Sequence, residues 1–433
     1  MPSLEKTTQF LESEEGKSQL SALYGGDQKA VGEQLERYRQ LLQKFRSAFP
    51  ERQEVELFSA PGRTEVGGNH TDHNLGRVLA AAVDLDAIAA AAPNSEGLVR
   101  VRSQGYPTLR LRVDELEPDE GERNTSAALI RGVLARFKQL GYDTGGFDAV
   151  IESRVPKGSG LSSSACYEVL IGTILNHLYN AGRLEPLLLA QIAQFAENHY
   201  FGKPSGLMDQ TASAVGGFVA IDFKDPRSPL VRKVSFDFGA SGYSVVIVDT
   251  RGDHAGLTGE YAAVQQEMKA VARALGGETL REFSEDQVLE NIERLRQEAG
   301  DRAVLRSLHF YRDDRRVVEQ VAALESSDFA RFLSLVNASG RSSWMLLQNC
   351  YPASAVREQG IPVALAVSEA ILGEQGAWRV HGGGFAGTIQ AFVPTRLLER
   401  YIERMERVMG AGSCYAVQVR AEGAARLRIG AQA

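Results

Sequence analysis

The sequence predicts a mixed α+β protein with two domains that follow a helical N-terminal extension. The chain has 433 residues, which is more than one compact domain usually contains. Short apolar or alternating runs, typical of strands, begin at Val55. Segments with the apolar spacing of helices dominate the second half of the chain.

The extension, residues 1–50, is expected to be helical and largely polar. Apolar residues recur in it at helical intervals: Leu20, Leu23, Tyr24, Leu35, Tyr38, Leu41, Leu42 and Phe45. It contains no recognisable catalytic residue.

The first domain is predicted over residues 51–225. Its strands are expected in the runs VELFSA, RVLAAAVDLDAIAAAAPN, LVRVRS, TLRLRV, FDAVIESRVP and GGFVAIDF. Helices are expected over 163–180 and 186–201. The sequence KDPRSP interrupts these patterns, so the boundary is expected near residues 224–242.

The second domain is predicted over residues 226–433. Strands are expected in YSVVIVDT, TIQAFVP and CYAVQVR. Helices are expected over 262–275, 285–298, 313–324, 329–338 and 395–409.

Composition narrows the class of protein. The formal net charge of −7 does not suit a nucleic-acid binder, and three scattered cysteines predict neither a disulfide framework nor a structural zinc site. The N-terminus lacks a signal-peptide core, and no run of about 18 apolar residues occurs. We expect a cytoplasmic protein without membrane or nucleic-acid partners.

A glycine- and serine-rich stretch, VPKGSGLSSSA at residues 155–165, leads directly into an apolar helix. Glycines allow close backbone approach to a phosphate, and the free amides of the helix N-terminus favour an anion. The stretch is not a Walker A loop, because GxxxxGK[ST] is absent. A simple turn with a serine cap is the alternative interpretation.

Three further segments combine glycines with polar groups. PGRTEVGGNHTDHN at 61–74 contains Arg63, His70 and Asp72, which suit sugar hydroxyls and a developing negative charge, or form a polar loop. AENHYFGKPSGLMDQ at 196–210 carries Glu197 and Asp209, which suit catalysis or merely compensate a helix dipole. RVHGGGFAG at 379–387 predicts close backbone packing or a hairpin turn.

Together these segments resemble the galactokinases and their relatives in the GHMP kinase superfamily. GRTEVGGNHTDHNLGRVL is similar to GRxNLIGEHTDYNxGxVL, and GSGLSSSA resembles the phosphate loop of the superfamily. AENHYFGKPSGLMDQ is similar to AExxFxGxxCGIMDQ, and HGGGFAG resembles GGGFGG. The resemblance runs from about Ser59 to Ala433, with the motifs in the family's order.

The resemblance implies the two-domain GHMP kinase fold. Its N-terminal domain is similar to domain 2 of ribosomal protein S5, and its C-terminal domain is ferredoxin-like. The implied reaction is phosphorylation of the C1 hydroxyl of galactose by ATP with Mg²⁺, in a monomer or weak homo-oligomer. Such a transfer depends on positioning and charge neutralisation rather than on a covalent intermediate.

The resemblance also assigns roles residue by residue. Asp209 and Arg63 are implied to be catalytic, and Ser164 and Glu197 to bind the metal. Sugar contacts are implied for Asn69, His70, Asp72, Gly206 and Tyr261. Nucleotide contacts are implied for Ser103, Lys157, Gly158, Ser159, Gly160, Leu161, Ser162, Ser163, Ser164 and Ala165.

Two departures from the family pattern leave the substrate open. Asn69 stands where galactokinases have Glu, and Glu65 stands where they have Asn. Because Asn is uncharged, galacturonic acid becomes an alternative to galactose, beside arabinose and N-acetylgalactosamine. A further hypothesis is a non-catalytic galactose and ATP sensor on the same fold, with the extension serving a partner.

Overall fold

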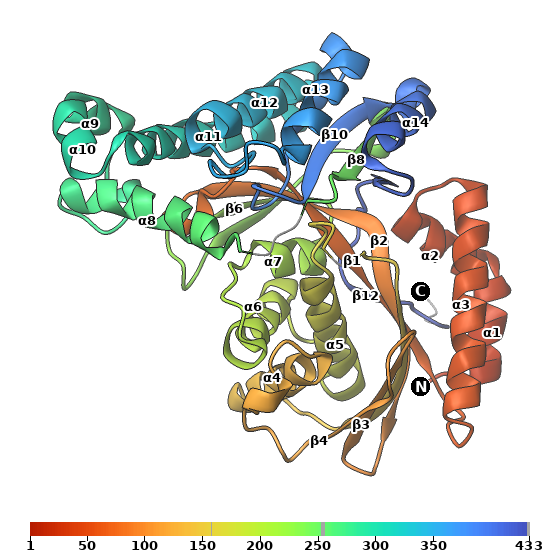
Figure 1. Ribbon diagram of the computed structural model, residues 1–433. Coiled ribbons are helices and arrows are strands. Elements are labelled where there is room, and N and C mark those ends of the chain that lie inside the picture. The colour runs from red at the N-terminus through yellow and green to blue at the C-terminus, as the bar shows by residue number, and fades with distance from the viewer. Residues whose placement is uncertain (157, 253–255, 431–433) are drawn as a thin grey trace.

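A large mixed sheet organises the first half of the chain in the computed structural model (Figure 1), which describes residues 1–156, 158–252 and 256–430. Its strands are β1 (Glu56–Gly67), β2 (Arg77–Asn94), β3 (Leu98–Ser103), β4 (Leu109–Arg112), β5 (Gly146–Ser153), β6 (Phe218–Asp222), β7 (Leu230–Val234) and β12 (Ala425–Arg426). They lie in the order β12-β1-β2-β5-β3-β4, while β6 pairs with the long strand β2 and β7 pairs with β6. Among the strands described for this sheet, only β3 and β5 pair in parallel.

Helices cover both faces of this sheet (Figure 1). On one face lie α4 (Ser126–Gln139), α5 (Ser163–Tyr179), α6 (Pro186–Ala196) and α7 (Met208–Val215). The extension lies against the other face as α1 (Leu4–Glu12), α2 (Glu14–Tyr24) and α3 (Gln28–Ala48).

The strand β2 shows why the sheet is covered twice. Ile88, Ala90 and Ala92 belong to the apolar core beneath the extension. Ala87, Ala89 and Ala91 belong to the core beneath α5. Since successive strand residues point to opposite faces, the continuous apolar run AIAAAA requires a layer on each side.

The second sheet is antiparallel and is formed by the later part of the chain. It contains β8 (Tyr243–Asp249), β9 (Ala377–Val380), β10 (Thr388–Pro394) and β11 (Cys414–Val417) in the order β11-β8-β10-β9. Its helices and those beside it are α8 (Thr258–Ala274), α9 (Glu285–Glu290), α10 (Ile292–Glu298), α11 (Asp301–Glu325), α12 (Phe329–Ser342), α13 (Gly360–Leu372) and α14 (Leu398–Met409).

The prediction of a mixed α+β fold with a helical extension is confirmed, but several elements differ. The helix predicted from residue 313 begins at Asp301, and the helix predicted over 285–298 breaks at Asn291. The α-helix α6 ends at Ala196 and continues as a π-helical turn, Glu197–Phe201. The helices α4 and α13 and the short strands β7, β9 and β12 were not predicted.

Strands from beyond residue 225 also join the first sheet. The strand β7 pairs with β6, and β12 near the end of the chain pairs with β1. The predicted domain division at 225/226 therefore does not coincide with the division between the two sheets, and it stays a prediction. Among the described residues, no helix is long and apolar enough to cross a membrane.

Candidate active site

The predicted phosphate loop connects the end of β5 to the start of α5. Gly158 and Gly160 adopt left-handed backbone angles, with φ of 74° and 73°. A side chain on Gly160 would place its Cβ 2.7 Å from His381 Nδ1 and 2.9 Å from Thr388 Oγ1. Glycine is therefore required at position 160 both by its conformation and by the neighbouring strand β10.

The N-terminus of α5 has no side-chain cap. Ser162, the residue before the helix, has φ of 57° and makes no capping hydrogen bond. Its hydroxyl instead donates to Asp209 Oδ2 at 2.7 Å. Without a side-chain cap, the amides of the first turn and the positive end of the helix dipole can receive an anion.

Arg63 and Asp209 form a bidentate ion pair beside this helix end. Although 146 residues separate them, Arg63 Nε lies 2.7 Å from Asp209 Oδ1 and Nη2 lies 2.5 Å from Oδ2. The arginine extends from β1, and the aspartate stands in the first turn of α7. Arg63 also donates to the carbonyl of Gly160, so the pair contacts the phosphate loop directly.

The electrostatics keep Asp209 ionised. Burial alone would raise the pKa of this carboxyl, but the charge and hydrogen bonds of Arg63 outweigh it, and Ser162 adds a further donor. The pKa of Asp209 is therefore below its usual range. The group is a carboxylate at neutral pH, able to accept a hydrogen bond from a hydroxyl.

A second carboxylate, Glu197, contacts the first turn of α5 through Ser164. Its side chain is 1% exposed, and Oε1 accepts hydrogen bonds from Ser164 Oγ at 2.7 Å and Lys203 Nζ at 3.0 Å. Gln210 Nε2 donates to Oε2 at 2.8 Å. Ser164 and Glu197 thus bring two hard oxygen ligands together next to the anion-binding amides.

The residues predicted to contact the sugar meet at two places. Gly206, three residues before Asp209, is one place, because a Cβ on it would lie 2.9 Å from Asp72 Oδ2. His70 Nε2 donates to the carbonyl of Gly383 at 3.0 Å, and Tyr261 Oη donates to that of Gly384 at 3.0 Å. The glycine-rich segment 382–384 therefore holds the His70 imidazole and the Tyr261 ring on one loop.

His70 is neutral at physiological pH. Burial lowers its pKa to about 4, and the neighbouring His73 acts in the same direction. Since Nε2 carries the hydrogen donated to Gly383, Nδ1 retains a lone pair that can accept a hydrogen bond from a hydroxyl.

Asn69, whose expected sugar contact stays a prediction, is enclosed by protein groups. The residue is fully buried, and its Nδ2 donates to Glu65 Oε1 at 2.9 Å and to the carbonyl of Gly382 at 2.8 Å. Its Oδ1 accepts from Ser343 and Asn349 at 3.2 and 2.9 Å. Its side-chain hydrogen bonds are thus made within the protein.

Ser103 and Ser159 are two further residues predicted to contact the nucleotide. Ser103 ends β3 and pairs in register with Ile151 of β5, two residues before that strand ends. Ser159 is buried, and its hydroxyl donates to the carbonyl of Pro156 at 2.8 Å. Lys157 lies outside the described residues.

Comparisons with known proteins identify relatives of the chain. The model of the galactokinase galactose-binding signature matches residues 43–93, and that of the GHMP kinase N-terminal domain matches residues 128–217. The galactokinase of Streptomyces coelicolor is 34% identical over 365 residues, covering 84% of this chain and 91% of that protein.

The chain belongs to the galactokinase family.

Solved structures extend this finding. The galactokinase of Lactococcus lactis, solved in complex with galactose, has a TM-score of 0.74 and 25% identity and covers 88% of this chain and 98% of its own. A mevalonate kinase has a TM-score of 0.59 at 15% identity, covering 84% of this chain and 98% of its own, which shows the fold alone. Membership of the galactokinase family makes the chain a sugar kinase.

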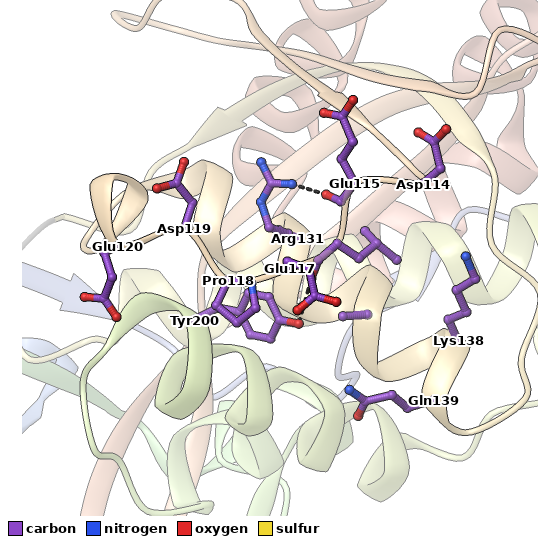
Figure 2. Close-up of a pocket in the computed structure, with 12 residues that line it drawn as sticks. Asp114, Glu115, Glu117, Pro118, Asp119, Glu120, Arg131, Lys138, Gln139 and Tyr200 are labelled. Carbon is purple, nitrogen blue, oxygen red and sulfur yellow. Dashed lines mark hydrogen bonds between the residues drawn. The ribbon is translucent and has the colours of Figure 1, made fainter.

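This galactokinase-family chain also has a groove of about 820 Å³ beside α4 (Figure 2), and neither Arg63 nor Asp209 lines it. Acidic side chains dominate its lining: Asp114, Glu115, Glu117, Asp119 and Glu120. Arg131 within it is already held by Glu122 and by the carbonyl of Glu115. So many carboxylates would repel phosphate, and we place no nucleotide there.

Sequence reasoning missed several residues that support the site. Arg379 Nη2 donates to Glu65 Oε1 at 2.7 Å, and His381 lies between Thr64 and Thr388 at 3.0 Å from each hydroxyl. Both stand in the RVHGGG segment, where the run of glycines is the more conspicuous sequence feature. Burial lowers the pKa of His381 well below its usual value, so this imidazole is neutral and acts as a spacer beside Gly160.

Proposed function

We propose that this sugar kinase transfers the γ-phosphate of ATP to the C1 hydroxyl of D-galactose, giving α-D-galactose 1-phosphate and ADP. The observation that carries the proposal is the bidentate Arg63–Asp209 pair at 2.5–2.7 Å, joined through Ser162 to the uncapped start of α5. A phosphate at that helix end and a hydroxyl at Asp209 are the two reactants of such a transfer.

The proposed roles follow from charge. The C1 oxygen attacks the γ-phosphorus, its proton passes to Asp209, and the bond to the ADP oxygen breaks. Arg63 stabilises the negative charge that develops on the attacking oxygen and the phosphoryl group. Because the pKa of Asp209 is lowered, it is a weak base, which suits a loose phosphoryl-transfer transition state in which the proton moves late.

Ser164 and Glu197 are the proposed ligands of Mg²⁺. Their oxygens lie 2.7 Å apart, and the Glu197 carboxylate is buried against the loop. Two protein oxygens suit a Mg²⁺ ion that keeps waters and phosphate oxygens as its other ligands. When bound, the ion neutralises phosphate charge and orients the triphosphate.

Galactose is the proposed sugar because a carboxylate persists near position 69. Glu65 Oε1 lies 2.9 Å from Asn69 Nδ2, so the chain has exchanged the positions of the family's amide and carboxylate. A retained carboxylate disfavours the negatively charged galacturonic acid relative to a neutral sugar. His70, Asp72, Gly206 and Tyr261 are proposed to contact the hydroxyls, with Asn69 supporting them from behind.

A non-catalytic sensor has no observation in its favour. The serine-glycine loop and the Arg63–Asp209 pair are both intact. The apolar face of the extension is buried against the large sheet and is not presented to a partner. The cytoplasm is the proposed location, since ATP is the substrate and the described cysteines are unpaired.

A coupled ADP-release assay over a panel of sugars tests the proposal. The panel contains galactose, galacturonic acid, arabinose and N-acetylgalactosamine, and the product is analysed by ³¹P NMR. We expect turnover with galactose and an α-1-phosphate product. Absence of turnover with every hexose and pentose by a folded protein would overturn the assignment.

A further inference from the structure

Lys203 makes an ion pair with the proposed metal ligand. Its ammonium lies 3.0 Å from Glu197 Oε1, the same oxygen that accepts the Ser164 hydroxyl at 2.7 Å. The Lys203 side chain is 53% exposed, whereas the Glu197 carboxylate is 1% exposed. One end of this pair thus lies inside the protein, and the other reaches it from the solvent side.

The backbone of Lys203 is anchored while its side chain is not. The amide of Lys203 donates to the carbonyl of Glu197 at 3.1 Å, as does the amide of Gly202. These bonds follow from the π-helical turn that ends at Phe201, where Gly202 adopts φ of 86°. The flexible four-carbon stem of lysine therefore starts from a fixed point beside the start of α5.

The groups around Glu197 explain why a cation is held there. Glu168 is fully buried, shares the Gln210 amide with Glu197 and has one oxygen without a hydrogen-bond partner. Arg63 is committed to Asp209 by two hydrogen bonds. A buried carboxylate without a counter-ion is costly, and Lys203 supplies that counter-ion to Glu197.

We propose that Lys203 is an exchangeable counter-ion that neutralises Glu197 before the metal–nucleotide complex binds and pairs with the nucleotide phosphates afterwards. The inference rests on the proposed function, because it assumes that the triphosphate lies at the start of α5. An ammonium and a divalent cation repel each other at one carboxylate oxygen, so binding of the metal displaces the lysine. Its stem then allows the ammonium to meet the phosphates at that helix end.

The exchange has two opposite consequences for a Lys203→Met variant. Metal-free nucleotide should bind about tenfold more weakly, because the Glu197 carboxylate, no longer neutralised by Lys203, would repel the phosphates at the start of α5. The divalent ion should half-saturate the nucleotide-bound protein at a concentration about three- to tenfold lower, because its competitor is gone. Replacing a lysine with a merely structural role would not weaken metal-free nucleotide binding and at the same time strengthen binding of the divalent ion.

Binding of the ATP analogue AMPPNP tests the inference without turnover. Calorimetry in EDTA measures metal-free affinity, and titration with Mn²⁺ followed by electron paramagnetic resonance measures the divalent ion. The proteins are the parent, Lys203→Met, Lys203→Arg and the control Lys224→Met, whose lysine is exposed on the turn after β6. Thermal unfolding of each variant verifies its fold.

The inference is supported if Lys203→Met binds metal-free nucleotide more weakly and the divalent ion more tightly than the parent. Lys203→Arg should then stay close to the parent in EDTA, and Lys224→Met should be unchanged in both measurements. Lys203→Met matching Lys224→Met in both measurements overturns it. The function is judged separately by the parent protein's sugar panel. If the parent phosphorylates galactose but Lys203→Met changes neither binding measurement, only the role of Lys203 is contradicted. If the parent is inactive, the proposed function is contradicted.

Discussion

Exchanging Glu65 and Asn69 tests whether the two positions act as one unit. Glu65 and Arg379 form an ion pair at 2.7 Å with side chains 7% and 0% exposed. The Arg379 Nε and Nη1 atoms are buried without a hydrogen-bond partner, so Glu65 is the neighbour that compensates this guanidinium. Asn69 completes the unit through its 2.9 Å bond to the same carboxylate oxygen.

The structure predicts the cost of each single change. Glu65→Asn removes the charge opposite a buried arginine, which should cost about 3 kcal/mol of unfolding free energy. Asn69→Glu adds a buried carboxylate beside Glu65 and removes the donor to Gly382, which should cost about 3–5 kcal/mol. The double exchange restores one carboxylate and one amide, so its cost should be about 3 kcal/mol less than the sum.

Equilibrium unfolding in urea of the parent, both single variants and the double variant measures this coupling. The control cycle pairs Asn69→Glu with Glu56→Asn, which breaks the Glu56–Arg426 ion pair elsewhere on β1 and should combine additively. A coupling below about 0.5 kcal/mol for the Glu65 cycle would refute the reasoning. The double variant should keep its preference for galactose over galacturonic acid in the sugar panel.

Three further predictions concern catalysis, pH and the extension. Asp209→Asn should lower kcat about 10²–10⁴-fold with the sugar KM nearly unchanged, whereas a loss below about tenfold would assign the main work to Arg63 or a water. Between pH 7 and pH 5 the parent should lose about 1–2 kcal/mol more unfolding free energy than a His70→Asn variant, because burial lowers the pKa of His70 to about 4 and the unfolded chain then binds the proton first. Comparing the two proteins separates His70 from buried carboxyls such as Asp84, whose pKa is raised to about 6 and which act in the opposite direction. Urea unfolding of both proteins at the two pH values measures the difference, and an identical loss in both would contradict it. Deleting residues 1–50 should prevent soluble folding, and an active 51–433 fragment with the parent unfolding midpoint would disprove it.

The sequence predicted the parts of the site that its motifs contain. The motif at 61–74 contributes Arg63, and the motif at 196–210 contributes Asp209 and Glu197. Spacing alone left each motif with a simpler interpretation as a turn or a cap. The family resemblance predicted that they meet, and the structure brings Arg63 and Asp209 into contact across 146 residues.

The parts that were missed depend on contacts between distant segments. The burial of Asn69 is produced by His309, which donates to its carbonyl, and by Ser343 and Asn349. These partners lie 240–280 residues away and carry no motif of their own. Lys203 was missed for the opposite reason, because a lone lysine in a loop matches the pattern of any solvated side chain.

The extension is a structural layer on the large sheet, and Asp86 of β2 shows how it is connected. This fully buried carboxylate accepts hydrogen bonds from Tyr24 Oη and Arg37 Nη1 at 2.5 Å each, and from Arg420 near the end of the chain at 3.2 Å. Burial alone would raise the pKa of Asp86, but the two arginines outweigh it and keep the group ionised.

Arg37 carries this connection to the phosphate loop. Its Nη2 donates to the carbonyl of Glu152 at 3.3 Å, one residue before β5 ends. The amide of Arg154, which opens the loop, donates to the carbonyl of Asp86 at 2.8 Å. Asp86 therefore holds the extension through Arg37, and it also holds the end of β5, from which the phosphate loop emerges, through the Arg37–Glu152 and Arg154–Asp86 hydrogen bonds. Loss of residues 1–50 would remove Arg37, so that of the two arginines only Arg420 would still pair with Asp86. The phosphate loop would also lose the support of Arg37, which no residue of the loop motif replaces.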